Sequence, residues 1–224
     1  GYLVHGYQAI KDFSSMDDKC GPMFDGIVDI YGAKGTPWGD WMEGHVLAIH
    51  GPEHRRIRNS IAHAFTPAAA NRFRARMRER ITELLDEWVP QGKFDFYEFV
   101  TNYPISVLCA VLGTGTEAVP RIRGFLEAQG QVLSLKLEKL PELHTGFEVT
   151  WKYVDGLVTE REKSGLKGDG SLLDSLIETK NAGQIDDKEL RYLLMVLFPG
   201  GYDTSRNMLT LTMYTMLQYP DHWK

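Results

Sequence analysis

The chain has 224 residues, of which 43% are hydrophobic and 25% charged, and a formal net charge of −5 at pH 7. This composition is ordinary for a globular protein and excludes a disordered tail, a low-complexity polymer and a general nucleic-acid binder, which needs a surplus of Lys and Arg. Cys20 and Cys109 are too few for a disulfide framework and form no C-x-x-C metal motif. Without a secretory leader or an apolar span of about 18 residues, the sequence predicts a cytoplasmic protein that does not enter a membrane.

The first 51 residues predict a strand, a helix and a long irregular segment. Residues 1–5 contain three apolar or aromatic residues, Tyr2 to Val4, between glycines, as in a short strand, and Tyr7 to Ser14 carries its apolar side chains at helical spacing. Residues 15–51 are punctuated by Gly and Pro and predict a long loop, of a kind that often forms a functional lid. The alternative is two or three short helices within the same segment.

Three helices and a strand are expected between residues 52 and 113. One helix follows Gly51, and a second starts with Thr66 as N-cap and Pro67 at the first helical position. The alternating residues 94–99 predict a strand, and the apolar residues 104–112 predict a helix. The second helix ends near Pro90 and has a stripe at helical spacing, formed by Phe73, Met77, Ile81, Leu84 and Trp88.

The remaining sequence predicts helices at 120–135, 144–163 and 171–179 and then one long helix at 186–218. Asp186 and Glu189 form a capping box at the start of this last helix. Its residues are mostly apolar on all sides, which indicates a buried helix. Pro199-Gly200-Gly201 is expected to interrupt it, because proline lacks the amide hydrogen that a helix interior needs.

Two basic side chains share a face with apolar residues on the helix after Gly51. At 100° per residue, His54 and Arg58 lie within about 60° of Ile61 and Phe65. Burying such charges requires an anion, and a ligand with carboxylates or phosphates could supply it. The alternative is an ion pair with a distant Asp or Glu. A metal site made by His50 and His54 is improbable, because Gly51 and Pro52 lie between them.

Eight arginines lie between residues 55 and 80. They could steer an acidic protein partner by their charge, or they could simply form a solvated basic face. They are Arg55, Arg56, Arg58, Arg72, Arg74, Arg76, Arg78 and Arg80.

The run Phe198-Pro199-Gly200-Gly201-Tyr202-Asp203-Thr204-Ser205 is the most specific feature of the chain. Two glycines let a ligand approach the backbone closely, and Asp203 and Thr204 place a carboxylate beside a hydroxyl. An opened helix here would suit a small polar ligand and a proton relay. The alternative is two separate helices, with Asp203 as the N-cap of the second.

Two motifs in this order resemble the cytochrome P-450 family, the haem-thiolate monooxygenases, and most closely its soluble bacterial members. The family's C-helix region is similar to residues 51–58 (GPEHRRIR) and 64–67 (AFTP). Its central I-helix motif, [AG]-G-x-[DE]-T-[TS], is similar to residues 200–205 (GGYDTS).

The resemblance implies a mainly α chain with minor β that forms one partial domain of the P-450 fold, from the B helix to the start of the J helix. Residues 1–51 would hold a strand, the B helix and the B–C loop, and residues 52–118 the C, D and E helices. Residues 119–170 would form the F and G helices. Residues 171–224 would form the H helix, the central I helix and the start of J.

The resemblance also implies roles for single residues. His54 and Arg58 would bind the haem propionates, and Gly200 and Gly201 would open the groove for dioxygen. Thr204 and Asp203 would deliver protons to bound dioxygen and help to split its O–O bond. Residues 24–46 and the F–G pair would cover an apolar substrate pocket, with Ile27, Tyr31, Leu133 and Leu197 as candidate lining residues.

The chain also departs from the family pattern. No E-x-x-R pair follows the central-helix motif, and the chain lacks the F-x-x-G-x-x-x-C-x-G loop that supplies the thiolate, so neither cysteine is expected to bind the haem iron. Pro199 within the central helix is a second departure. The chain is therefore expected to be the middle half of a haem-dependent monooxygenase acting on an apolar small molecule, and to be inactive by itself. The rival function is a haem-free helical ligand-binding or regulatory protein.

The expected partners follow from the same resemblance. A ferredoxin-like or flavin-containing electron donor would dock on the side of the arginine patch, while nucleic acids and membranes are not expected to bind. Since the long helix would expose an apolar patch without later elements of the fold, the chain is also expected to self-associate.

Overall fold

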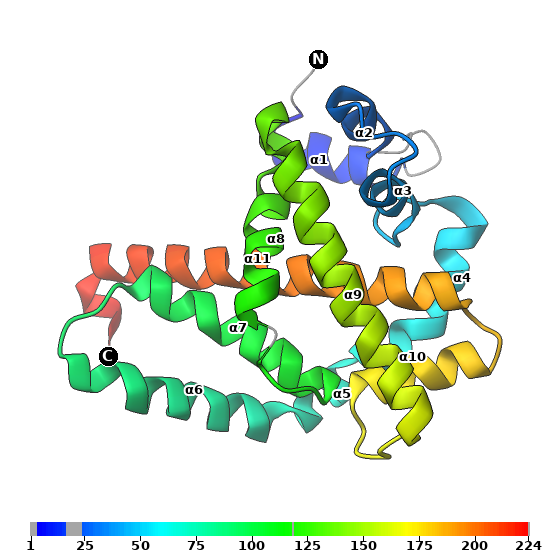
Figure 1. The fold of residues 1–224 in the computed structure, drawn as a ribbon. Coiled ribbons are helices and arrows are strands. Elements are labelled where there is room, and N and C mark those ends of the chain that lie inside the picture. Colours follow the sequence, from blue (N-terminus) through cyan, green and yellow to red (C-terminus); the bar gives the residue numbers. More distant parts are fainter. Residues whose placement is uncertain (1–3, 17–23, 118, 224) are drawn as a thin grey trace.

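The structure is a computed structural model that describes residues 4–16, 24–117 and 119–223. This part of the chain is helical and contains no strand (Figure 1), which confirms the predicted mainly α class. No helix in it is both long and apolar enough to cross a membrane. The α-helices are α1 (Tyr7–Ser14), α2 (Asp25–Tyr31), α3 (Pro37–Gly44), α4 (Gly51–Ile61), α5 (Pro67–Arg72), α6 (Arg74–Trp88), α7 (Phe96–Leu112), α8 (Val119–Gly130), α9 (Leu140–Ser164), α10 (Leu172–Asn181) and α11 (Asp187–Gln218).

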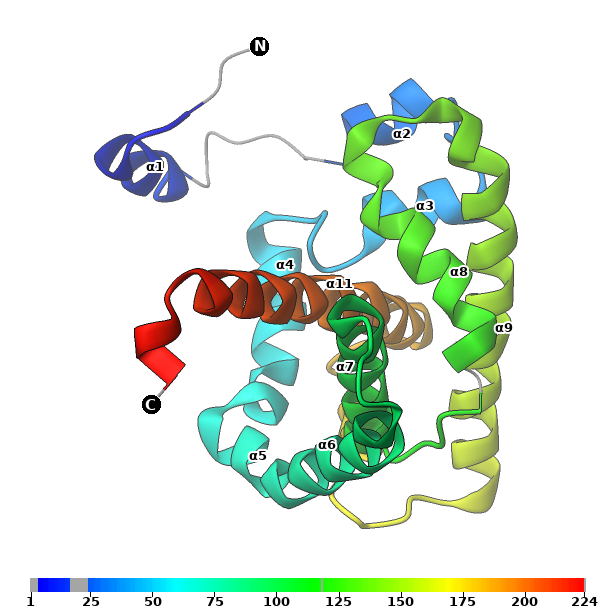
Figure 2. The same cartoon turned by 90° about the vertical axis from the view of Figure 1, so that its left-hand side faces the viewer.

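The long helix α11 runs through the centre of the molecule, and the other long helices pack across it (Figure 1). α7 and the paired helices α8 and α9 contact it, and α6 packs on α7. The main core surrounds the amino-terminal half of α11, where Leu194, Met195 and Phe198 have no exposed surface. Figure 2 shows α1 apart from the other helices, and none of its residues is buried.

The segment before α4 contains two short helices, so the alternative to a long loop is the correct one. α2 ends at Gly32, whose φ of 64° is left-handed and suits glycine. α3 begins after Thr36, whose hydroxyl accepts a hydrogen bond from the amide of Gly39 at 3.1 Å. The indole of Trp38 then donates to the side-chain oxygen of Gln129 at 3.1 Å. This bond fixes α3 against the end of α8.

The structure tests one predicted strand in full and the other only in part. The strand at 94–99 is wrong, because α7 starts at Phe96 and continues through Pro104. Asp95 caps it by accepting the amide of Tyr97 at 2.8 Å, and Phe99 packs edge-on against Trp88 with ring centroids 5.9 Å apart. The strand at 1–5 lies partly outside the described residues, and the part within them has no regular structure.

The predicted helix from Thr66 to Pro90 is divided into α5 and α6. Thr66 caps α5 as expected, by accepting the amide of Ala69 at 3.2 Å. The break falls at Phe73, which is buried and keeps right-handed helical angles, but donates its amide to the carbonyl of Ala70, three residues back, at 3.1 Å. The predicted apolar stripe survives the break, since Phe73 and Leu84 are both buried.

α11 is continuous from Asp187 to Gln218, so the predicted interruption at Pro199 is wrong, as is the alternative of two helices with Asp203 as a cap. The predicted capping box is present: Asp186 accepts the amide of Glu189 at 2.7 Å, and Glu189 accepts that of Asp186 at 2.8 Å. Proline lacks only one hydrogen bond and its φ suits a helix. Buried Phe198 and Tyr202 on either side hold the backbone in register.

His45 packs inside the connection between α3 and α4. Its ring lies between Phe24 and Trp41, with both centroid distances at 5.0 Å, and its Nδ1 accepts the amide of Leu47 at 3.2 Å. Burial lowers its pKa from 6.5 to about 4. Because the folded chain resists protonating this ring, His45 stabilises the fold fully above pH 6.5 and loses that contribution as the pH falls towards 4.

We therefore expect the free energy of unfolding to fall by about 2 kcal/mol between pH 7 and pH 5 through His45 alone. Urea unfolding at a series of pH values measures it. His45→Asn, which keeps an acceptor for Leu47 but cannot titrate, should be less stable at pH 7 and lose this part of the pH dependence. An unchanged slope in His45→Asn would contradict the assignment.

Candidate functional site

One side of α11 is exposed to solvent in the part of the helix that extends beyond the core. Gly200, Thr204, Met208 and Leu211 recur at helical spacing and are all exposed, Met208 by 68% and Leu211 by 64%. A Cβ added to Gly200 would meet no atom within 4 Å. We call these four residues the open face of α11. They form a largely apolar strip with one hydroxyl group and one stretch of bare backbone.

The two glycines of the motif point in different directions. A Cβ on Gly201 would lie 3.5 Å from a methyl group of Leu108 on α7, whereas Gly200 faces open space. Gly201 therefore serves the packing of α11 on α7. Only Gly200 leaves room on the open face for a ligand to approach the backbone.

Thr204 presents its hydroxyl on the open face. Its Oγ1 donates to the carbonyl oxygen of Gly200 at 2.5 Å. The hydroxyl is thereby held along the helix surface and keeps lone pairs that can accept a further proton or hydrogen bond. The structure describes no other partner for it.

Asp203 does not contact Thr204. Its carboxylate lies next to Gly130, where a Cβ would be 3.3 Å away. Its Oδ1 accepts from Arg206 at 2.5 Å and its Oδ2 from Asn207 at 3.2 Å. The two predicted proton donors are therefore adjacent in sequence but on different sides of the helix.

Arg206 is the partner of Asp203 that the motif did not indicate. Its guanidinium is buried between the rings of Tyr97 and Tyr202, at 5.0 and 4.7 Å from their centroids, and donates to the Tyr202 hydroxyl at 3.1 Å. Burial raises the pKa of Tyr202. The available signal was spacing, since an Arg three residues after an Asp lies on the same helix face.

His54 and Arg58 lie on α4 without partners. His54 is half-buried and Arg58 exposed, and neither forms a hydrogen bond or ion pair with any residue that the structure describes. The alternative of pairing with a distant acid is therefore wrong for these residues. Arg56 between them behaves differently: it forms an ion pair with Glu189 and donates to the carbonyl of Gln184 at 2.8 Å.

The ion pair between Arg56 and Glu189 shows which part of α11 the helix α4 contacts. Arg56 fixes α4 beside Glu189 at the beginning of α11, and Thr204 lies about 22 Å further along that helix at 1.5 Å per residue. Ile57 and Ile61 anchor α4 in the core. The described residues include no cluster of His, Cys, Asp or Glu that could hold a metal ion.

The four predicted pocket residues divide into two groups. Ile27 and Tyr31 are buried on α2, and the Tyr31 hydroxyl donates to the carbonyl of Val132 at 3.2 Å. Leu133, which follows Val132, is 70% exposed. The fold thus brings these three to one corner, whereas Leu197 lies half-buried on α11.

The arginine patch is partly used within the fold. Arg76 donates to the carbonyl of Ala110 at 3.2 Å, and Arg80 pairs with Glu83 at 2.6 Å. Four further arginines on α4 to α6 are exposed and have no partner among the described residues: Arg55, Arg72, Arg74 and Arg78.

Of the two cysteines, only Cys109 lies among the described residues. It is buried inside α7, and burial raises the pKa of its thiol to about 11. A thiol in this state is neither deprotonated nor accessible at neutral pH. Cys109 is therefore a packing residue of the core.

Comparison with known proteins gives one family. The model of the family described as Cytochrome P450 matches residues 128–224. Luteothin monooxygenase from Streptomyces thioluteus is 32% identical over 203 residues, which is 89% of this chain and 49% of the relative. Pentalenic acid synthase from Streptomyces avermitilis is 31% identical over 179 residues, or 79% of this chain and 42% of the relative.

Solved structures agree with this result. The epothilone B-bound cytochrome P450epoK superposes with a TM-score of 0.76 at 21% identity, over 87% of this chain and 50% of that one. The structure of SgvP, described as a putative thioether synthase, has a TM-score of 0.68 at 30% identity, over 79% of this chain and 44% of that one. The chain thus spans about half the length of the relatives it matches.

Proposed function

This chain belongs to the cytochrome P450 family, and we propose that the protein it comes from is a haem-dependent monooxygenase that inserts one oxygen atom from dioxygen into an apolar small molecule. The observation that carries the proposal is the open face of α11. It combines bare backbone at Gly200 with the Thr204 hydroxyl and an apolar continuation. A helix surface of this kind suits a flat apolar ring system beside a proton donor.

The residues of this chain fit part of a haem site. Gly200 and Thr204 offer bare backbone and a hydroxyl to a flat ligand. His54 and Arg58 are basic side chains without a described partner, and their charge suits the two propionates. The described ion pair between α4 and α11, from Arg56 to Glu189, lies towards the other end of α11. Haem, when bound, would supply the redox and dioxygen chemistry. The axial thiolate is expected outside the described residues, because Cys109 is buried and protonated.

The chain's own groups would bind, position and move protons. Thr204 would give its proton once its hydroxyl turns away from the Gly200 carbonyl, to which it now donates. Asp203 would turn away from Arg206 and Asn207, take up a proton from solvent and pass it to Thr204, which restores the hydroxyl. The helices α2, α3, α8 and α9 would cover the substrate, near Ile27, Tyr31, Leu133 and Leu197, and keep water out.

The partners would follow from the surface. The unpaired arginines of α4 to α6 would receive an acidic ferredoxin-like or flavin-containing electron donor. The exposed apolar side chains at the end of α11, such as Leu211, Tyr214 and Leu217, would drive self-association of the chain in isolation. We assign residues 1–51, 52–118, 119–170 and 171–224 to the family's helices as predicted above.

A spectrum of the isolated chain tests the proposal. Mixed with haem, reduced and exposed to carbon monoxide, the chain should not produce the absorption band of a thiolate-ligated haem, because its described cysteine cannot ligate. A protein that joins this chain to the Cys loop of the family should produce that band and consume dioxygen. The band in the isolated chain, or its absence in the joined protein, would contradict the proposal.

A further inference from the structure

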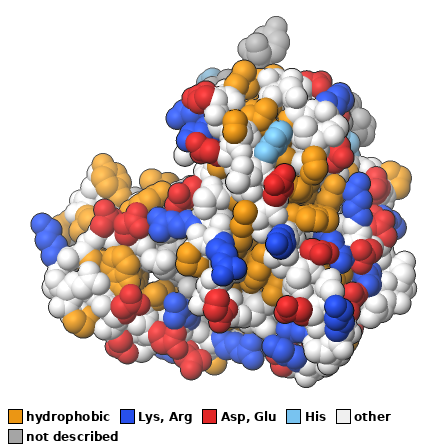
Figure 3. Space-filling view, in the orientation of Figure 1, with side chains coloured by type: hydrophobic (Ala, Val, Ile, Leu, Met, Phe, Trp, Pro, Cys, Tyr) orange, Lys and Arg blue, Asp and Glu red, His pale blue; other side chains and the backbone are white. Residues whose placement is uncertain are grey.

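A groove of about 700 Å³ lies on the side of the molecule where α3, α9 and the beginning of α11 meet. Its volume is in the range of small-molecule binding sites. Figure 3 shows hydrophobic side chains at this surface with acidic and basic side chains beside them. From Tyr192 in the groove to Thr204 on the open face, α11 rises about 18 Å. The groove is therefore separate from the site described above.

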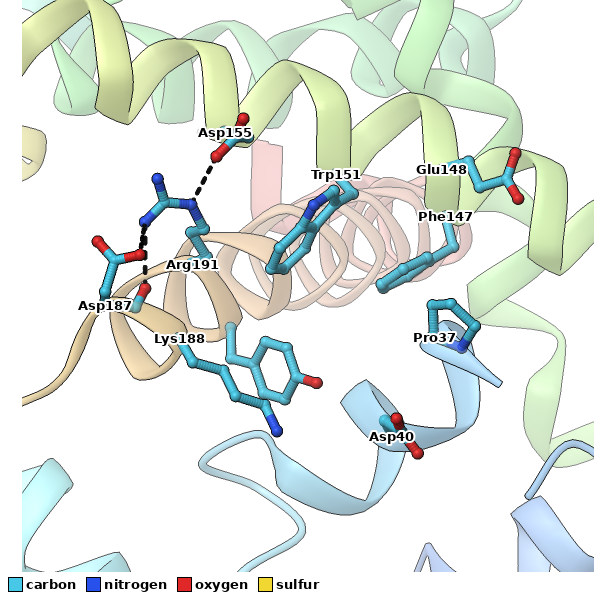
Figure 4. A pocket seen from close by; sticks show the side chains of 10 residues that line it. Pro37, Asp40, Phe147, Glu148, Trp151, Asp155, Asp187, Lys188 and Arg191 are labelled. Atoms are coloured by element: carbon cyan, nitrogen blue, oxygen red, sulfur yellow. Dashed lines mark hydrogen bonds and ion pairs between the residues drawn. The ribbon is translucent and has the colours of Figure 1, made fainter. Parts of the chain in front are cut away.

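The wall of the groove is aromatic. Phe147 and Trp151 project from α9 (Figure 4), with their rings stacked at a centroid distance of 6.0 Å. Trp151 also meets Tyr192 of α11 edge-on at 6.0 Å. Because Phe147 and Tyr192 are almost completely buried, these rings have fixed orientations. They hold the half-buried ring of Trp151 in place, and this ring offers a preformed surface to a ring-bearing ligand.

The aromatic wall already makes one cation–π contact with a side chain of the protein itself. The ammonium group of Lys188 lies 5.0 Å from the centre of the Tyr192 ring. At this distance the negative face of the ring attracts the charge. A ligand cation could occupy a similar position over Trp151, whose ring has no described cation partner.

The charged side chains of the groove differ in whether they have partners within the protein. Arg191 is fully used, because it pairs with Asp155 at 2.7 Å and with Asp187 at 2.6 Å (Figure 4). Asp40 on α3 and Glu148 on α9 also line the groove, and neither carboxylate forms an ion pair or hydrogen bond with a described residue. The groove thus holds four carboxylates and two cations, Lys188 and Arg191, so its net charge is negative and it repels anions and attracts cations.

We propose that this groove binds a small organic cation that carries an apolar ring. Trp151 receives the ring, and the negative charge of Asp40 and Glu148 attracts the ammonium group. The site does not depend on haem or on the proposed oxygenation, because all its residues lie on this chain and away from the open face.

Three probes of one shape test the proposal by isothermal titration calorimetry with the whole chain: phenethylamine, which is a cation at neutral pH, the neutral 2-phenylethanol and the anionic 3-phenylpropionate. The amine should bind at one site, about 5-fold more tightly than the alcohol, and the acid should bind most weakly. Equal or tighter binding of the alcohol or the acid, or no saturable binding of the amine, overturns the proposal.

Variants locate the binding. The double variant Asp40→Asn, Glu148→Gln should weaken the amine about 5-fold and leave the alcohol unchanged, whereas Trp151→Leu should weaken both about tenfold. Glu160→Gln removes an exposed carboxylate of α9 outside the groove and should change neither. Circular dichroism confirms that each variant folds. If the double variant binds the amine as well as the original chain does, the proposed site is wrong.

Discussion

Replacing Arg161 by methionine is expected to lower the free energy of unfolding by about 3–5 kcal/mol, because the change leaves Asp174 as an unpaired buried charge. Both side chains are only 6% exposed, and they form an ion pair inside the protein. Arg161 also donates to the carbonyl of Gly113 at 3.2 Å and to the hydroxyl of Ser171 at 3.3 Å. A single side chain thus joins the end of α9 to the end of α7 and the start of α10.

Urea unfolding of matched variants measures this effect. Arg123→Met breaks two half-exposed pairs, with Glu127 and Glu98, and should cost at most about 1 kcal/mol. If Arg161→Met does not fold, Asp174→Asn provides a milder change at the same contact. Replacing both residues with apolar ones should recover part of the loss, since the uncompensated charge is gone. A loss no larger than that of Arg123→Met would show that the buried pair does not hold these helices together.

Local signals predicted much of the helical framework. The Thr66 cap and the capping box of Asp186 and Glu189 are formed by residues three apart, so the sequence contains all that they require. The glycine at 113 likewise ends α7 in a left-handed conformation. These elements depend on neighbours along the chain and not on the rest of the fold.

The elements that were predicted wrongly depend on distant contacts. Pro199 indicates a break by itself, but the packing of Phe198 and Tyr202 outweighs one missing hydrogen bond. The aromatic alternation before Pro104 resembles a strand until Asp95 caps a helix there and Trp88 packs on it. Tertiary packing overrides local preference in both cases.

The candidate site also combines features that the sequence predicts with features that depend on neighbouring helices. The motif located Gly200, Thr204 and Asp203 on one helix, and the resemblance assigned their roles. Two contacts of this site come from neighbouring helices: Gly201 packs on Leu108 of α7, and the Asp203 carboxylate lies next to Gly130 of α8. The motif itself does not predict these contacts, whereas the pairing of Asp203 with Arg206 follows from their spacing on α11.

The central claim is that the open face of α11 is the reacting side of a haem monooxygenase. Its most direct test is product formation by the haem-loaded protein that joins this chain to the rest of the family fold. Thr204→Ala should lower the rate about 100-fold, because it removes the only hydroxyl of the open face as a general acid. Thr204→Ser, which keeps the hydroxyl, should stay within about threefold of the original rate.

Thr210→Ala is the matched control. Its hydroxyl donates to the carbonyl of Arg206 at 2.9 Å, the same type of bond that Thr204 makes, but it points away from the open face. It should leave the rate unchanged. We expect a large loss of rate for Thr204→Ala alone, with rescue by serine. Equal rates for Thr204→Ala and Thr210→Ala would contradict the proposed role of the open face.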